Sequence, residues 1–374
     1  MKQASKVVIC GGGTGGHIFP AISIANQLRK IRPEIEILFI GAKGRMEMES
    51  VPAAGYHIEG LPIKGFDRKR PLKNIVVMWK LFISLIKSVV ILKRFKPQIA
   101  IGVGGFASGP ALRIAAMLRI PTLIQEQNSF AGVTNKLLAK HADKICVAYT
   151  GMERFFPKEK IILTGNPVRQ EVLKSDGKRE MAIETFGLNP ARKTILIIGG
   201  SLGAGTINES LAAGIDEIRA SDSIQVIWQC GKYYYDELKT LPTLEDAPNI
   251  HLMPFIKEMD QAYAVADLVI SRAGASSISE LCLLEKAVIL IPSPNVAEDH
   301  QTVNAQALVK NNAAIMVADL SAQDCLIGLM LDTIADDERL ATLRTNIAKM
   351  ALPNASEIIV NEILQIIETP NTQE

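Results

Sequence analysis

Features of metal-dependent, disulfide-bonded and exported proteins are scarce in this sequence. Five cysteines are spread over 374 residues without a C-x-x-C pair, so neither a zinc site nor a disulfide framework is expected. The five histidines are isolated and there is no D-x-D pair, which argues against a divalent-metal site. The start, MKQASKVVIC, has an apolar run too short for a signal peptide, and a reducing cytoplasm is the expected compartment.

A glycine-rich stretch, GGGTGGHIFP at 11–20, lies between an apolar run and a segment of helical periodicity. Gly11, Gly13 and Gly16 match G-x-G-x-x-G, the fingerprint of dinucleotide-binding loops. That fingerprint also needs an acidic residue after the next strand to bind a ribose. Here the next strand ends in GAKG at 41–44, without an acid. The loop alone therefore fits a dinucleotide loop, another phosphate or sugar loop, or a tight turn.

Short β-branched runs alternate with helical stretches along the chain, which predicts parallel sheets covered by helices. One series is KVVIC, EILFI, QIAIGV, TLIQ and KICVA, and the other is TILIIGG, IQVIWQCG, DLVISRAG, AVILIP and AAIMVA. A charged stretch near 166–192 separates them. We expect an α/β protein of two doubly wound, Rossmann-like domains, 1–166 and 167–349, with a C-terminal helix, about 350–374, packing on the first. Because ligands bind beyond the carboxyl ends of such strands, the two glycine loops should face each other across a cleft.

One segment, Lys64–Lys96, is strongly basic. It holds ten basic residues and one acid, a local net charge of +9 in a chain of net charge +2. Lys73, Lys80, Lys87 and Arg94 recur every seven residues and would form a stripe on a helix whose other faces are apolar. Every window of 18 residues in this segment contains a lysine, so a membrane-spanning helix is not expected. The pattern favours a helix lying on an anionic membrane surface over a solvated basic stripe on a core helix.

The stretch SRAGASSISE at 271–280 is the sharpest candidate for a binding site. A helix is expected to start near Ser276, where its N-terminus favours a phosphate, with Glu280 one turn later placed to accept a ribose diol. The alternative is ordinary helix capping by Ser276 or Ser277.

Three other stretches carry polar residues at the ends of predicted strands. GGSLGAG at 199–205 suits an anion but lacks the lysine of a P-loop, which disfavours nucleoside triphosphate hydrolysis. PNVAEDHQTVNA offers His300, Gln301 and Asn304 for sugar hydroxyls or for capping, and QEQN offers Glu126 and Asn128.

Seven motifs, in order, give the whole chain a resemblance to a known family. They are GGGTGGHIFPAI, GVGGFASGPAL, QEQNSFAGVTNKLLA, GNPVR, GGSLGA, SRAGASSISE and EDHQTVNA. The chain resembles the N-acetylglucosaminyltransferases of peptidoglycan assembly, the MurG family, which are inverting enzymes that convert lipid I to lipid II. The resemblance implies the two-domain GT-B fold, an acceptor- and membrane-binding first domain, a UDP-sugar-binding second domain, and no metal or other cofactor.

The resemblance also implies a set of binding residues and partners. UDP-N-acetylglucosamine would contact Thr14, Gly15, Gly16, Asn128, Arg169, Ser201, Ile256, Ala275, Ser276, Ser277, Ile278, Ser279, Glu280 and Gln301. The membrane contacts would come from Lys73, Trp79, Lys80, Phe82, Lys87 and Arg94. The expected partners are UDP-N-acetylglucosamine, the undecaprenyl-linked lipid I, an anionic membrane surface on the cytoplasmic side and other proteins of cell-wall synthesis. Nucleic acid is not expected.

The catalytic base has two candidates. His17 would accept the proton of the acceptor hydroxyl, with Glu126 as the rival and a helix-capping role as the structural alternative. The sequence departs from the family at Gln125, where many relatives have histidine, and at Ser277, which replaces a common threonine.

Other functions remain compatible with parts of the pattern. A GT-B epimerase of UDP-sugars or another lipid-acceptor glycosyltransferase would share the nucleotide residues. A nicotinamide oxidoreductase would use the first glycine loop, and a non-catalytic membrane scaffold would need only the basic helix.

Overall fold

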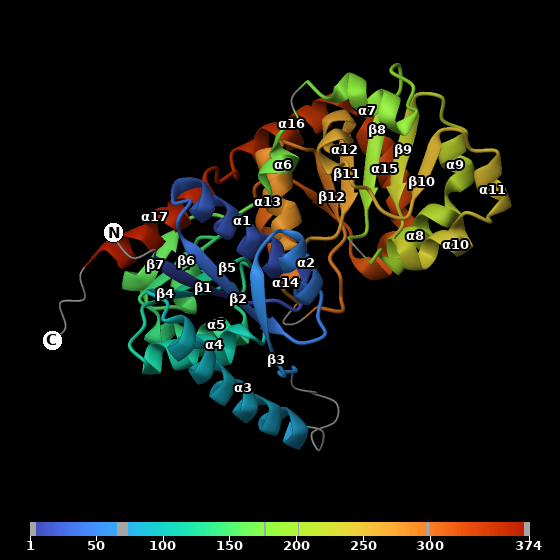
Figure 1. Ribbon diagram of the computed structural model, residues 1–374. Helices are drawn as coiled ribbons and strands as arrows, with labels where there is room; N and C mark the ends of the chain where they lie inside the picture. The colour runs from blue at the N-terminus through green and yellow to red at the C-terminus, as the bar shows by residue number, and fades with distance from the viewer. Residues whose placement is uncertain (1–4, 66–73, 176, 201, 297–298, 370–374) are drawn as a thin grey trace. The chain divides into compact units, whose positions relative to one another are not determined.

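The chain folds into two compact units, each built on its own sheet. The computed structural model describes residues 5–65, 74–175, 177–200, 202–296 and 299–369. One unit comprises Met1–Arg169 and Leu352–Glu374, and the other Gln170–Ala351. In each, helices cover both faces of a parallel sheet (Figure 1).

The first unit contains a parallel sheet of seven described strands in the order β3-β2-β1-β4-β5-β6-β7. The strands are β1 (Lys6–Cys10), β2 (Glu36–Ala42), β3 (His57–Leu61), β4 (Ile99–Gly102), β5 (Thr122–Glu126), β6 (Lys144–Val147) and β7 (Ile161–Leu163). The main helices are α1 (Gly15–Ile31), α2 (Glu47–Ala53), α3 (Asn74–Phe95), α4 (Ser108–Met117), α5 (Val133–Leu138) and α17 (Ala355–Glu368). Alternate residues of β1 enter two different core clusters, Val8 in one and Val7 in the other, so both faces of the sheet are buried.

The second unit repeats this plan with six described strands in the order β10-β9-β8-β11-β12-β13. They are β8 (Lys193–Ile198), β9 (Ile224–Gln229), β10 (Ile250–Met253), β11 (Leu268–Ser271), β12 (Val288–Leu290) and β13 (Ile315–Met316). Its helices are α6 (Gln170–Leu173), α7 (Arg179–Phe186), α8 (Gly205–Ala213), α9 (Ile215–Arg219), α10 (Lys232–Leu238), α11 (Pro242–Glu245), α12 (Met259–Val265), α13 (Ala275–Leu283), α14 (His300–Val309), α15 (Ala322–Ala335) and α16 (Asp337–Ala348).

The last helix, α17, belongs to the first unit although it follows the second in sequence. It packs against α1 through Ile359, Val360 and Ile363, which are fully buried in the same cluster as β1. Lys144 of β6 forms an ion pair with Glu362 at 3.0 Å. The first sheet is therefore covered on one face partly by chain that comes after the whole second unit.

In each sheet, the chain adds strands on one side of the first strand and then crosses to add the next strands on its other side. In the first unit β1 lies between β2 and β4, and in the second β8 lies between β9 and β11. At such switch points the loops after adjacent strands diverge to opposite faces and leave a crevice for ligands. Both glycine-rich loops, 11–14 and 199–204, follow the strands at these points.

All ten predicted strand runs form strands, and the doubly wound fold is confirmed. The sequence reading missed β3, β7 and β10, each of which is an edge strand. Edge strands are covered less completely, so they need fewer consecutive apolar residues than the central strands do. HIEGL in β3 and IHLM in β10 carry polar residues and lack the β-branched runs used as the signal.

Candidate functional site

The glycine loop after β1 arranges backbone groups around His17. His17 is the third residue of α1, and the N-cap of that helix is Thr14, so the capping role for His17 is wrong. Its Nδ1 lies 3.1 Å from the Gly12 carbonyl oxygen and 3.2 Å from Thr14 Oγ1. Because a carbonyl oxygen can only accept, Nδ1 carries the proton in the neutral ring and Nε2 carries the basic lone pair.

The loop after β4 packs directly against the first glycine loop. Gly104 and Gly105 both have positive φ, and a Cβ on Gly105 would lie 2.2 Å from the Gly12 carbonyl oxygen. A Cβ on Gly104 would lie 2.9 Å from His17 Nε2. Glycine at these two positions lets the second loop approach the first, with the His17 ring beside its backbone.

Glu47 contacts the glycine loop after β1 and was not singled out in the sequence. It begins α2, five residues after the end of β2, and is 1% exposed. Its Oε2 accepts the Gly13 N–H and its Oε1 accepts the Ala42 N–H, both at 2.9 Å. The acid sought after strand two is thus present but binds the loop itself, which explains why a dinucleotide ribose has no acceptor there.

Glu126 ends β5 and organises the loop that follows. Its oxygens accept the Asn128 and Gly132 N–H groups at 3.0 and 2.9 Å and the side-chain amides of Asn128 and Asn135 at 3.3 and 2.9 Å. These four bonds match the roughly four acceptor sites of a carboxylate. Glu126 therefore positions Asn128, and its geometry is that of a loop anchor rather than of a proton acceptor.

Gln125, where the family often has histidine, is fully buried. Its Nε2 donates to Asn166 Oδ1 at 3.1 Å, and Gln127 donates to its Oε1. Asn166 in turn donates to the Gln127 carbonyl at 3.0 Å. The amide thus belongs to a buried network that ties the loop after β5 to the segment before Arg169. Arg169 lies over the Phe19 ring, with its guanidinium carbon 5.2 Å from the centroid.

In the second unit, α13 begins at Ala275, close to the predicted start. Its N-cap is Gly274 and no side chain caps it, so the capping alternative for Ser276 and Ser277 is wrong. Ser276 Oγ is buried and, among the described residues, finds no hydrogen-bond partner. Orphaned buried oxygens are rare and call for a ligand or another explanation. A helix start that no side chain of the described residues caps, with such a hydroxyl beside it, has the chemistry to bind a phosphate.

Glu280 is held one turn further along α13. It is 6% exposed, and its Oε2 accepts a hydrogen bond from the Tyr263 hydroxyl at 3.3 Å. Tyr263, on α12, was not singled out in the sequence. The remaining helix positions alternate between core and surface: Ile278 is buried, while Ser277 and Ser279 are half-buried.

A largely buried ion pair connects the loops around the second switch point. Arg272, directly after β11, pairs with Asp319, whose other oxygen accepts the Thr206 hydroxyl at 2.9 Å. Arg272 also donates to the carbonyls of Ile291 and Pro292 at 3.1 and 3.3 Å. Arg272 and Asp319 together thus connect the loop after β11, the loop after β12, the start of α8 and the segment at Asp319. Thr206 lies in the first turn of α8, whose N-cap is Ala204.

Two further residues predicted to contact the donor occupy the loops beside this network. Gln301, at the start of α14, accepts the Ser293 N–H at 2.9 Å, so its amide NH2 group is the part that can donate to a sugar hydroxyl. Ile256 is 2% exposed, which leaves its backbone for a contact with a base. Ser201 lies outside the described residues.

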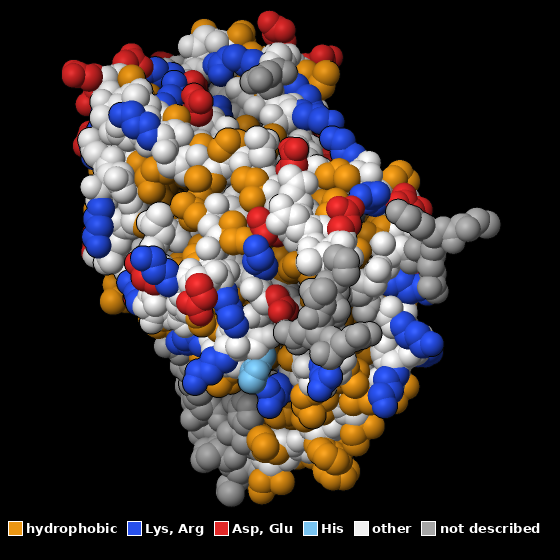
Figure 2. Space-filling model, turned by 90° about the vertical axis from the view of Figure 1, so that its left-hand side faces the viewer, with side chains coloured by type: hydrophobic (Ala, Val, Ile, Leu, Met, Phe, Trp, Pro, Cys, Tyr) orange, Lys and Arg blue, Asp and Glu red, His pale blue; other side chains and the backbone are white. Residues whose placement is uncertain are grey.

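Helix α3 packs on α4 and β3 and leaves most of its large apolar side chains exposed. Its buried side includes Ser84 and Ser88, while eight large apolar side chains are exposed. This α3 apolar face comprises Ile75, Val76, Met78, Trp79, Phe82, Ile83, Ile86 and Val90. Figure 2 shows hydrophobic side chains gathered at the lower end of the molecule, where α3 lies, bordered by basic ones.

Half of the predicted basic stripe is engaged within the protein. Lys87 donates to the Gly60 carbonyl at 2.8 Å, and Glu59 of β3 pairs with both Lys87 and Arg94. Lys80 is partly exposed and Lys73 lies outside the described residues. In length and composition Ile75–Phe95 could also cross a membrane, with 28% of the span buried in the protein. Its contacts with α4 and β3 fit a helix docked in the fold.

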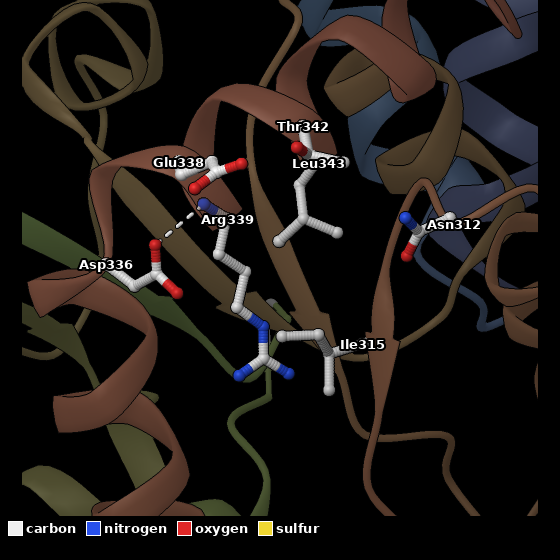
Figure 3. Close-up of a pocket in the computed structure, with 7 residues that line it drawn as sticks. All are labelled: Asn312, Ile315, Asp336, Glu338, Arg339, Thr342 and Leu343. Atoms are coloured by element: carbon white, nitrogen blue, oxygen red, sulfur yellow. Dashed lines mark hydrogen bonds between the residues drawn. The ribbon is translucent and has the colours of Figure 1, made fainter.

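A surface hollow of about 270 Å³ lies away from all predicted site residues. It is lined by Asn312, Ile315, Asp336, Glu338, Arg339, Thr342 and Leu343. In Figure 3 the Arg339 side chain extends beside Ile315. The backbone N–H of Arg339 donates to the carboxylate of Asp336, the N-cap of α16. These contacts are those of a helix start beside an edge strand.

Comparison with known proteins assigns both units. The glycosyltransferase family 28 N-terminal domain matches residues 7–147, and the C-terminal domain of that family matches residues 194–359. This chain belongs to glycosyltransferase family 28. Membership of family 28 agrees with the glycine loops and uncapped α13 described above.

Individual relatives narrow the family 28 assignment. UDP-N-acetylglucosamine--N-acetylmuramyl-(pentapeptide) pyrophosphoryl-undecaprenol N-acetylglucosamine transferase from Bacteroides fragilis is 58% identical over 98% of this chain and 97% of that protein. The protein of that name from Flavobacterium psychrophilum is 52% identical over 97% of this chain and 98% of its own. The MurG structure from Acinetobacter baumannii matches with a TM-score of 0.77 at 27% identity, covering 96% of this chain and 99% of that one.

Some structural neighbours of this family 28 protein carry out other reactions. UDP-GlcNAc 2-epimerase from Neisseria meningitidis, bound to UDP-GlcNAc, matches with a TM-score of 0.67 at 16% identity, covering 96% of this chain and all of that one. That likeness extends to the fold alone. Both relatives named above, 58% and 52% identical over nearly the whole chain, carry the name of the transferase, so the family predicted from the seven motifs is confirmed.

Proposed function

We propose that this protein transfers N-acetylglucosamine from UDP-N-acetylglucosamine to the muramoyl C4 hydroxyl of lipid I, giving lipid II for peptidoglycan synthesis. The observation that carries this proposal is 58% identity to the Bacteroides fragilis transferase over nearly the whole length of both chains. In the reaction, the acceptor oxygen bonds to the anomeric carbon of N-acetylglucosamine as the bond from that carbon to the diphosphate breaks. UDP leaves, and the configuration at the carbon inverts.

The donor nucleotide is assigned to the second unit. The start of α13, from Ala275 to Ser279, binds the diphosphate through its N–H groups and the Ser276 hydroxyl, and Glu280 accepts the ribose hydroxyls. The backbone at Ile256 contacts uracil, Gln301 contacts the sugar, and Ser201 and Arg169 approach the nucleotide and its diphosphate. The buried Ser276 oxygen without a partner supports this assignment.

The base is assigned to the first unit. His17 Nε2 accepts the proton of the acceptor hydroxyl, because the Gly12 carbonyl keeps the ring proton on Nδ1. Thr14, Gly15, Gly16 and Asn128 contact the transferred sugar. Glu126 supports Asn128, since its oxygens accept two bonds from that residue.

A transfer assay separates this function from the epimerase alternative. Radiolabelled UDP-N-acetylglucosamine is incubated with a lipid I analogue and, separately, without any acceptor. We expect label in the lipid product and free UDP only when the acceptor is present. Formation of UDP-N-acetylmannosamine without acceptor, and no labelled lipid, would assign the chain to the epimerases instead.

We further propose that the α3 apolar face docks the first unit on the cytoplasmic face of an anionic membrane. The acceptor is lipid-linked, and exposed apolar surface of this extent marks an interaction site. Lys80 and Lys73 would contact anionic headgroups, whereas Lys87 and Arg94 contribute less because Glu59 pairs with them. Trp79 and Phe82, 64% and 54% exposed, would enter the interface.

The docking proposal is tested with the double variant Trp79→Ser and Phe82→Ser. We expect it to lose binding to vesicles containing anionic lipid and to slow transfer to a membrane-borne acceptor, while transfer to a short water-soluble analogue is retained. The matched control is Met181→Ser on α7, 54% exposed like Phe82. Equal loss with both acceptors, or unchanged vesicle binding, would contradict docking through this face.

A further inference from the structure

The peptide group between Gly12 and Gly13 is hydrogen-bonded at both ends by side chains. Its N–H, on Gly13, donates to Glu47 Oε2 at 2.9 Å, and its carbonyl, on Gly12, lies 3.1 Å from His17 Nδ1. Glu47 and His17 are thus joined through a single peptide plane. The arrangement has the order carboxylate, peptide, imidazole.

The Glu47 carboxylate is fixed in this position by the surrounding backbone. It is 1% exposed, and its second oxygen is occupied by the Ala42 N–H. A Cβ on Gly12 would lie 2.2 Å from Oε1, and one on Gly41 would lie 2.6 Å from the Glu47 Cγ. Glycine at both positions leaves the space that the Glu47 side chain fills. A larger residue at either position would displace the carboxylate.

A carboxylate in this position changes how the Gly12 carbonyl acts on the histidine. Hydrogen bonds in a chain polarise one another, so an anion accepting the N–H makes the carbonyl of the same peptide a stronger acceptor. Histidines are commonly oriented and fixed in one tautomer by a carboxylate or carbonyl on the other ring nitrogen. Here the carboxylate is one peptide away, and the Thr14 hydroxyl, 3.2 Å from Nδ1, can accept a share of the same N–H.

We propose that Glu47 is a positioning residue for His17, selecting the tautomer with the proton on Nδ1 through the Gly12–Gly13 peptide. The proposal rests on the proposed role of His17 as base, because it gives Nε2 the lone pair that the reaction needs. A purely structural role would be different: Glu47 would hold the loop in place, and the His17 tautomer would not depend on it.

The test combines nitrogen NMR with steady-state kinetics. In wild-type protein labelled with ¹⁵N-histidine, with the His17 signals assigned by their loss in His17→Ala, we expect a protonated Nδ1 and an unprotonated Nε2. In Glu47→Gln we expect a mixture of tautomers and a kcat lower by about tenfold to a hundredfold, the range for removal of a histidine's orienting partner. The KM for UDP-N-acetylglucosamine should stay within about twofold, because the donor nucleotide binds the second unit.

Two further variants keep the test decisive. Glu49→Gln removes an exposed acid two residues along α2 and should change neither signal nor rate. Glu47→Asp retains the charge and should recover part of the kcat. If Glu47→Gln does not fold, the wild-type spectrum and the Asp variant still decide, since a proton on Nε2 in the wild type overturns the proposal.

Failure of this inference is distinguishable from failure of the base assignment. Full turnover in His17→Ala would remove the base role whatever Glu47 does. Loss of turnover in His17→Ala, with unchanged tautomer and kcat in Glu47→Gln, would keep the base and reject Glu47 as its positioning residue.

Discussion

The two units share one local motif, but different side chains contact it in each unit. Each places a strand, a glycine-rich loop and a helix at the switch point of a parallel sheet. In the first unit Glu47 contacts the loop directly, because its carboxylate accepts the Gly13 N–H. In the second unit Asp319 accepts a hydrogen bond from Thr206 of α8, the helix that follows the loop, and pairs with Arg272. The same glycine pattern is thus held by a carboxylate on its own backbone in one unit and by an ion pair beside the following helix in the other.

The difference shows why a glycine fingerprint alone does not identify a ligand. Backbone N–H groups bind phosphate only where the protein has not supplied its own anion. The Gly13 N–H donates to Glu47, so this group of the first loop is not available to bind a phosphate.

The largest effect is expected from removing the arginine of the second unit. Arg272→Ala leaves Asp319 largely buried without its charge partner and removes the donor to two loop carbonyls, which should lower the free energy of unfolding of this unit by about 3–5 kcal/mol. Denaturant unfolding measures it. Adding Asp319→Asn should restore part of the loss, and a loss below about 1 kcal/mol would show that the network does not hold the loops.

Removing the histidine of the first unit should affect turnover and spare nucleotide binding. His17→Ala is expected to lower kcat by about a hundredfold or more, the usual contribution of a general base. UDP affinity, measured by calorimetry, should stay unchanged because the nucleotide belongs to the second unit. Weakened UDP binding in this variant would mean that the first loop also holds the nucleotide, against the division drawn above.

Removing Glu280, the proposed ribose acceptor, should instead weaken nucleotide binding. Glu280→Ala should weaken UDP binding by about 1.5–3 kcal/mol, since hydrogen bonds to a charged group contribute that much. Calorimetry on the folded variant gives the value directly. An unchanged affinity would exclude Glu280 as the ribose acceptor, and UDP selectivity should persist because uracil is assigned to the backbone at Ile256.

The smallest effect concerns the orientation of that carboxylate. Tyr263→Phe removes one hydroxyl that donates to Glu280 and should weaken UDP binding by about 0.5–1.5 kcal/mol. In the Glu280→Ala background the same change should have no further effect on UDP affinity. A loss of equal size in both backgrounds would show that Tyr263 acts through packing instead.

The fold could be predicted because central strands of a parallel sheet are buried on both faces and therefore read as continuous apolar runs. The edge strands β3, β7 and β10 lack that constraint and escaped the reading. The start of α13 could be predicted from Gly274 and the serines after it. The family could be predicted from the seven motifs, whereas length, composition and net charge did not indicate it.

Contacts between segments distant in sequence could not be predicted in the same way. An acid at the start of a short helix, such as Glu47, has the ordinary appearance of a residue favoured by the helix dipole. Likewise, a seven-residue spacing places Lys87 and Arg94 on one side of α3, but only the fold reveals that Glu59 of β3 lies there. The four hydrogen bonds that Glu126 accepts could not be predicted either, because they depend on how the loop after β5 folds around the carboxylate.

The position of α17 has a consequence for how this protein is made. Ile359, Val360 and Ile363 complete the core beside α1 and β1, but the ribosome adds them only after the entire second unit. At typical synthesis rates of about 5–20 residues per second, the 182 residues of Gln170–Ala351 take roughly 10–40 s. During that interval the nascent first unit exposes the apolar surface that α17 later covers. The first unit therefore completes its core only when the chain is nearly finished, and until then the apolar surface that α17 covers is open to aggregation.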